Sequence, residues 1–167
     1  NLGAEPIDYS LSRTGMNPFR DILDTFRLAA LLRRLRPDVT LGYTIKPVIY
    51  GTIAAWLARV PRRLAMIEGL GYLFTPSGGN ASKRKVLLQT IVRHLYKYSL
   101  AKAEHVFFLN PDDLKEFVDG GLVARSKAVK LGGIGVDLDE WPVVPPARKP
   151  VTFLLAARLL REKGICE

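Results

Sequence analysis

Two basic residues near the end of the chain have the types and the spacing that a phosphate ligand requires. Arg158 and Lys163 follow residues 151–157, an apolar run that is typical of a buried strand. On a loop that opens a helix, a guanidinium and an ammonium can hold a diphosphate together with the helix amino terminus. The same two side chains could instead lie on a solvated surface, so the spacing alone leaves both interpretations open.

A glycine-rich segment, GGIGVD at residues 132–137, precedes this basic pair. Gly133, Gly135 and Asp137 superficially match part of a dinucleotide-binding fingerprint. The third glycine of that fingerprint is missing, however, and the segment leads into prolines rather than into a helix. We therefore reject NAD binding for this segment.

Other residues that could do acid–base or metal chemistry are few. Glu68 stands before the turn GLGY at residues 69–72. A carboxylate there can act as a base or accept a hydrogen bond, and an exposed structural glutamate is an equal alternative. His94 and His105 are the only histidines and lie in different elements. Without a Cys/His cluster we expect no metal site, and no Ser/His/Asp arrangement is apparent.

The apolar pattern alternates between strands and helices along the chain. Strands are expected at residues 5–9, 38–43, 62–67, 103–109, 128–131 and 151–157. Helices are expected at residues 19–36, 46–60, 83–102 and 110–121. The expected strands are dense in apolar residues, which predicts an open parallel α/β sheet with a Rossmann-like arrangement.

Five segments rich in glycine, proline or polar residues follow these strands. They are SRTGMN, TIKP, EGLGY, NPDD and GGIGVD. Ligands of open α/β sheets bind beyond the carboxyl ends of the strands, so we expect the five segments to gather along one edge. Any one of them could also be an ordinary turn.

Composition and charge narrow the class of protein. The chain has 167 residues, with 48% hydrophobic and 25% charged residues, which suits a globular protein with its own core. Its one cysteine, Cys166, permits no intrachain disulfide. A net charge of +9 favours anionic partners such as phosphorylated ligands, acidic membranes or nucleic acid.

The expected helix 83–102 offers one place for a membrane contact. Its apolar stripe is most simply a core face, formed by Leu87, Leu88, Ile91, Leu95 and Tyr98. Its basic flank with Tyr96 and Tyr98 could instead lie against anionic lipid. Nucleic-acid binding is not expected, because no recognised module is visible.

Five segments together resemble the family 4 glycosyltransferases, which are retaining enzymes with the GT-B fold. They are RPDVTLGYTIKPVIYGTIAA, VPRRLAMIEGLGYLF, FFLNPDDLKEF, GGIGVDLDEWP and VTFLLAARLLREKG. They occur in the family's order over nearly the whole chain, and they look most similar to bacterial enzymes of O-antigen, capsule or lipopolysaccharide synthesis.

The resemblance implies one half of a two-domain architecture. Residues 1–133 would be an incomplete acceptor-side domain, residues 134–150 a linker, and residues 151–167 the start of a nucleotide-sugar domain. The implied location is cytoplasmic, with peripheral contact at the inner face of the cytoplasmic membrane left open. Because the family's first strands would precede Asn1, we also expect exposed edges and self-association of this chain.

The resemblance also implies roles for individual residues. Arg158 and Lys163 would contact the donor diphosphate, with a looser role for Gly133, Gly135 and Asp137. The acceptor-side candidates lie at the expected cleft edge: Arg13, Lys46, Gly69, Leu70, Gly71 and Tyr72. Many relatives have a histidine before the turn that GLGY matches, where this chain has Glu68, so the catalytic residue stays unassigned.

The expected partners are therefore a nucleotide-sugar, most simply UDP-linked, and a lipid-linked or saccharide acceptor. No cofactor or metal is expected. Two alternatives stay open: a nucleotide-sugar 2-epimerase, which shares the fold but uses no acceptor, and a non-catalytic domain that binds a membrane surface.

Overall fold

A computed structural model describes residues 3–11, 17–69, 83–133 and 135–145, together with 150, 151, 153, 154 and 156. Within this part, four parallel strands form one sheet in the order in which they occur in the chain. They are β1 (Val39–Tyr43), β2 (Arg62–Ile67), β3 (His105–Phe108) and β4 (Ala128–Lys130). The architecture is the open parallel α/β sheet that the sequence predicts.

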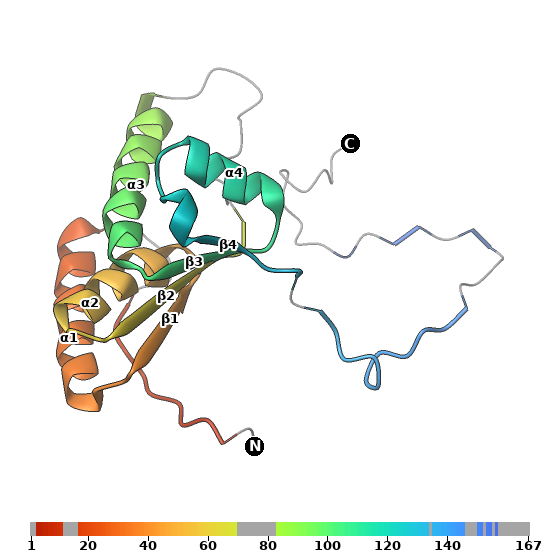
Figure 1. The fold of residues 1–167 in the computed structure, drawn as a ribbon, viewed down its shortest axis with the longest axis horizontal. Helices are drawn as coiled ribbons and strands as arrows, with labels where there is room; N and C mark the ends of the chain where they lie inside the picture. The colour runs from red at the N-terminus through yellow and green to blue at the C-terminus, as the bar shows by residue number, and fades with distance from the viewer. Residues whose placement is uncertain are drawn as a thin grey trace.

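The helices lie together on one face of this sheet (Figure 1). They are α1 (Pro18–Leu35), the π-helical turn η1 (Pro47–Gly51) that continues into α2 (Thr52–Leu57), α3 (Lys83–Lys102) and α4 (Pro111–Asp119). A short 3₁₀ turn, η2 (Arg125–Lys127), precedes β4. Right-handed crossovers that always add the next strand on the same side place every connecting helix on the same face. None of the described helices is long and apolar enough to span a bilayer.

The core lies between the sheet and this helical layer. Alternate strand residues point into it, among them Ala65, Ile67, Val106 and Phe108. The opposite face of β1 is different, because Val39, Leu41 and Tyr43 are all exposed. No described helix covers that face (Figure 1).

Two of the predicted strands are not strands where the structure describes them. Residues 5–9 are extended but unpaired and exposed, and Pro6 lacks the N–H that a strand ladder needs. Residues 151, 153, 154 and 156 are likewise not in a strand, and the rest of 151–157 lies outside the described residues.

The buried face of α3 differs from the predicted stripe. Val92, Tyr96, Ser99 and Leu100 are buried, whereas Leu87, Ile91 and Tyr98 are exposed. Tyr96 packs edge-on against Phe117 of α4, with ring centroids 5.3 Å apart. The interpretation of Tyr96 as part of a lipid-facing flank is therefore wrong, because its ring belongs to the core.

Helix α1 buries a polar face. Asp21, Asp24, Thr25 and Ala29 point inward. Its large apolar residues Phe19, Ile22, Leu23 and Phe26 are exposed. The apolar repeat thus predicted the helix correctly but does not mark its buried side.

Candidate functional site

The carboxyl ends of the strands bring most of the predicted loop segments to one edge of the sheet. TIKP follows β1, EGLGY follows β2, NPDD begins just beyond β3 and GGIGVD just beyond β4. Because all four strands are parallel, these segments start at the same edge, as predicted. SRTGMN differs, because it follows no strand and most of it lies outside the described residues.

Lys46 sits at this edge but is not a free cation. Its Nζ atom lies 2.6 Å from Oδ1 of Asp21, and both side chains are largely buried, at 16% and 5% exposure. Asp21 comes from the first turns of α1, so this ion pair joins α1 to the loop after β1. The charge of Lys46 is therefore compensated within the protein.

Tyr50 completes this polar group. Burial raises the pKa of its hydroxyl, and so do the negative charge of Asp21 and a hydrogen bond to that carboxylate. All three causes favour the neutral phenol, which keeps the hydroxyl as a hydrogen-bond donor at physiological pH. Lys46 and Tyr50 together therefore satisfy a carboxylate that has been removed from water.

A largely apolar hollow of about 1000 Å³ opens beside this group. Its polar end is formed by Asp21, Lys46 and Tyr50. Apolar side chains from three regions line the rest: Leu11, Leu41, Ile45, Ile49, Leu88, Ile91 and Leu95. An apolar cavity with a few convergent polar groups is the usual form of a small-molecule or lipid site.

The backbone at this edge is tightly constrained. A Cβ atom on Gly42 would lie 2.8 Å from the carbonyl oxygen of Pro47, so only glycine lets η1 pack so closely on β1. Thr44 follows with φ of 65°, a left-handed conformation that is uncommon for a residue other than glycine. The chain therefore turns sharply from β1 to Lys46, which fixes the position of that side chain.

Glu68 and Gly69 lie at the end of β2 and are exposed. The described residues provide no hydrogen bond or ion pair for the Glu68 carboxylate. Its place at the edge fits the prediction, and its role in catalysis stays a prediction. Across the described residues, no group of three or more His, Cys, Asp or Glu side chains could hold a metal ion.

Two glycines of the segment after β4 have left-handed backbone angles. Gly133 and Gly135 have φ of 104° and 75°, which other residues adopt only with strain. The carboxylate of Asp137 accepts a hydrogen bond from the N–H of Asp139 at 2.9 Å and so starts the next turn. The glycines are thus explained by local backbone geometry, and their contact with a donor stays a prediction.

The remaining predicted site residues lie outside the described residues. On the acceptor side these are Arg13, Leu70, Gly71 and Tyr72. On the donor side these are Arg158 and Lys163. Their roles stay predictions.

The start of α4 is at the same edge but is unsuited to an anion. Asn110 caps the helix by accepting a hydrogen bond from the N–H of Asp113 at 2.8 Å. Asp112 and Asp113 occupy the first turn. These carboxylates already complement the positive end of the helix dipole, so a phosphate would meet like charge there.

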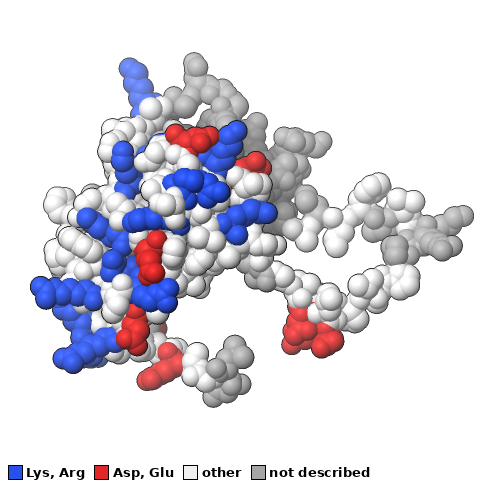
Figure 2. All heavy atoms as spheres, viewed as in Figure 1, with Lys and Arg blue, Asp and Glu red and all other residues white. Residues whose placement is uncertain are grey.

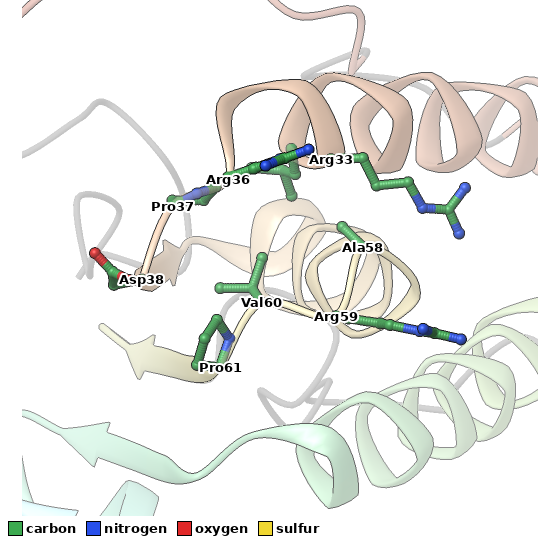
Figure 3. Close-up of a pocket in the computed structure, with 9 residues that line it drawn as sticks. Arg33, Arg36, Pro37, Asp38, Ala58, Arg59, Val60 and Pro61 are labelled. Carbon is green, nitrogen blue, oxygen red and sulfur yellow. The ribbon is translucent and has the colours of Figure 1, made fainter.

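A second hollow, of about 730 Å³, lies at the opposite edge of the sheet, where α1 and α2 end and β1 and β2 begin. Arg33, Arg36 and Arg59 line it, and Figure 3 shows Arg33 and Arg59 extending away from the strands. Arg33 donates a hydrogen bond to the carbonyl oxygen of Leu57, the last residue of α2. Cations at the carboxyl ends of helices are stabilising, and Arg33 and Arg34 lie in the last turn of α1.

Reasoning from the sequence missed Asp21, Asp24 and Tyr50. The available signal was the pair of aspartates at a three-residue spacing within an apolar helix, which places both on one face. Two acidic side chains on one helix face indicate either a solvated side or a buried polar network. Only the position of Lys46 decides between the two.

Comparison with known proteins now identifies the family. The family described as glycosyl transferase 4-like matches residues 5–110. The chain belongs to this family.

A curated relative from Campylobacter jejuni extends the comparison. It is named N,N'-diacetylbacillosaminyl-diphospho-undecaprenol alpha-1,3-N-acetylgalactosaminyltransferase and is 29% identical over 181 aligned residues. The alignment covers all of this chain and 46% of the relative. The chain therefore spans about half the length of that glycosyltransferase, and its open parallel sheet is consistent with one half of a GT-B enzyme.

Proposed function

We propose that the whole protein is a glycosyltransferase of bacterial surface-glycan synthesis, such as O-antigen, capsule or lipopolysaccharide. It moves a sugar from a nucleoside diphosphate donor, most simply UDP-linked, to a lipid-linked or saccharide acceptor, and the anomeric configuration is retained. Family membership over residues 5–110 is the observation that carries the activity. The donor class, the retention and the acceptor are parts of the proposal.

The hollow at the carboxyl edge supports an amphiphilic acceptor. Its apolar lining and its polar end with Lys46 suit a molecule that has both an apolar and a polar part. The name of the Campylobacter relative specifies an acceptor of this kind, a saccharide on diphospho-undecaprenol. We assign this hollow to the acceptor side of the site, within an acceptor-side domain at residues 1–133.

The donor side is assigned to Arg158 and Lys163, beyond a linker at residues 134–150. The bond between the anomeric carbon and the leaving phosphate oxygen breaks while the acceptor oxygen forms a new bond on the same face. The departing phosphate takes the proton of the acceptor hydroxyl. Preorganised cations beside that phosphate lower the barrier, because negative charge develops there in the transition state.

The test uses the full-length enzyme with UDP-sugars and a polyprenyl-diphosphate saccharide. We expect glycosylated lipid that forms only when acceptor is present, with retained configuration by nuclear magnetic resonance. Arg158→Ala or Lys163→Ala should lower the transfer rate by about 100-fold or more and leave acceptor affinity nearly unchanged. Conversion of the donor sugar without acceptor would instead show an epimerase, and absence of any turnover would show a non-catalytic protein.

A lipid-linked acceptor also supports a place for the enzyme at the membrane. We propose a cytoplasmic protein that contacts the inner face of the cytoplasmic membrane without spanning it. The high positive charge is consistent with this location, because that leaflet carries anionic lipids. No cofactor other than the donor sugar nucleotide enters the proposed reaction.

A further inference from the structure

The chain that follows β1 has an unusual backbone where it enters η1. Thr44 has φ of 65°, in the left-handed region, and Pro47–Gly51 form a π-helical turn in place of an ordinary α-helical start. Strained dihedral angles and π-helical turns are rare, and they occur preferentially at functional sites. Both features belong to the backbone itself, so neither depends on which surfaces are covered in the whole protein. They mark residues 44–51 as a candidate for ligand binding.

Three side chains at this segment form one buried polar group, which consists of Asp21, Lys46 and Tyr50. Nζ of Lys46 lies 2.6 Å from Oδ1 of Asp21, and both side chains are largely buried. The hydroxyl of Tyr50 is hydrogen-bonded to the same carboxylate. These contacts and their burial are already present within this half of the protein, so further elements can add to the burial but are not needed to create it.

The charges of the buried polar group cancel. The ammonium of Lys46 is balanced by the carboxylate of Asp21, and the raised pKa of Tyr50 keeps its hydroxyl neutral. Within the described residues, the ammonium donates one of its three N–H groups, to Asp21. The phenol oxygen of Tyr50 can accept a hydrogen bond while its proton is donated. The group therefore offers a ligand both donors and an acceptor, but no net charge.

These properties discriminate between the chemical groups of a ligand. Phosphate oxygens only accept hydrogen bonds, and their negative charge would be repelled by Asp21. A hydroxyl or amide group is uncharged and can accept from Lys46 while it donates to Tyr50. Lys and Arg predominate over Asp and Glu on the face shown in Figure 2, so a phosphate group finds net positive charge more readily there than at a compensated pair.

The apolar part of the hollow fits the same kind of ligand. Ile45, Ile49 and Leu95 line it together with the buried polar group. A sugar ring has hydroxyl groups at its edge and C–H groups on its faces, and an N-acyl substituent adds a methyl group. Such a ring can direct its polar edge to Lys46 and Tyr50 and its apolar face to the aliphatic side chains.

We propose that the hollow at the carboxyl edge binds an uncharged sugar ring of the acceptor and excludes its diphosphate. Lys46 and Tyr50 contact the sugar, and Asp21 is a positioning residue that fixes both and cancels the charge of Lys46. The diphosphate of a lipid-linked acceptor then lies outside this hollow. The inference rests on the proposed function, which supplies an acceptor that carries a saccharide, and it adds which part of that acceptor is bound here.

The test compares two ligands on the full-length enzyme, without donor sugar. One is a short-chain polyprenyl diphosphate that carries a saccharide, and the other is the same polyprenyl diphosphate without sugar. Isothermal titration calorimetry measures both affinities. Tyr50→Phe should weaken binding of the saccharide ligand about tenfold, for one lost hydrogen bond, and leave the sugar-free ligand unchanged. Tyr98→Phe, which removes a hydroxyl from α3 outside the hollow, is the matched control and should change neither affinity.

Asp21→Asn separates positioning from support of the fold. The substitution keeps an amide in place of the carboxylate but leaves the charge of Lys46 uncompensated. We expect the sugar-free diphosphate to bind about fivefold more tightly than to the wild type, because the hollow gains a net positive charge. The saccharide ligand should bind more weakly. Damage to the fold would weaken both ligands, so opposite changes identify the positioning role.

Several results would overturn the inference. They are equal changes for both ligands in Tyr50→Phe, no change for either, or no gain for the sugar-free ligand in Asp21→Asn. Loss of the sugar-free ligand in Lys46→Met would place the diphosphate at Lys46 instead, and would leave the proposed glycosyltransferase activity intact. If the wild-type enzyme bound neither ligand, the acceptor class in the proposed function would be wrong as well.

Discussion

Helices α1 and α4 begin in the same way, but α4 buries an aromatic residue together with Asp113, whereas the large apolar residues of the first turns of α1 are exposed. Each starts with asparagine and proline, at Asn17 and at Asn110, and each asparagine caps its helix. Helix α4 then buries Phe117 and exposes Asp112, whereas α1 buries Asp24 and exposes Phe26. A capping motif thus sets where a helix starts but carries no information about which face meets the core.

The cause of the difference lies outside the two helices. Helix α4 covers β3 and β4, whose inward side chains are apolar, so an aromatic face fits there. Helix α1 packs mainly on α2 and η1, beside the cation of Lys46. The positive charge of Lys46 therefore favours burial of the polar face of α1. The elements that a helix packs against determine which of its faces is buried.

The largest expected effect is a loss of stability, and it is tested by substituting one aromatic residue in each helix. Phe117→Ala should lower the free energy of unfolding by about 4 kcal/mol, because the ring is 1% exposed and packs between Phe108 and Tyr96. Phe26→Ala should change it by no more than about 0.5 kcal/mol. Urea denaturation measures both values. A large loss for Phe26→Ala would mean that the Phe26 side chain is buried in solution.

A second comparison sets the aspartates of the two helices against each other. Asp21→Ala leaves the buried ammonium of Lys46 without its partner and should cost about 3 kcal/mol. Asp112→Ala removes only a favourable charge at the start of α4 and should cost about 0.5 kcal/mol. Replacing both members of the pair, as Asp21→Leu with Lys46→Met, should recover most of the loss. Equal costs for the two single variants would show that Asp21 is not buried with its charge.

The smallest expected effect concerns the shared start. Asn17→Ala and Asn110→Ala should each cost about 1 kcal/mol. Asn110 should lose slightly more, because its cap hydrogen bond is shorter, at 2.8 Å against 3.2 Å, and its amide also donates to Asp113. The difference in stability loss is measured by thermal unfolding of the two variants under the same conditions. If only one substitution lowered the stability, the asparagine cap would contribute to the stability of one helix and not of the other.

The sequence was sufficient for the architecture of the sheet. Residues 64–67, LAMI, are apolar on both faces of the expected strand, and the alternation of such runs with helices makes a parallel sheet the simplest arrangement. Apolar runs that contain a proline predicted strands less well. Residues 5–9 have an apolar pattern with a proline inside it, and the backbone there has no strand partner in the described residues.

The candidate site could be predicted only in part, because it depends on contacts between distant residues. The edge of the sheet follows from strand direction, so Lys46 and Glu68 were placed correctly along it. The pairing of Lys46 with Asp21 joins residues that no local pattern connects. The burial of Tyr96 depends in the same way on Phe117, which belongs to another helix.

The order of the strands has a consequence for how the chain acquires its fold. Each strand pairs with the one that immediately precedes it in the sequence, from β1 to β4. During synthesis, each new pairing can form once the next strand has left the ribosome, without waiting for later segments. Such sequential pairing keeps loop-closure distances short. The described sheet can therefore be assembled one strand at a time, in the direction of translation.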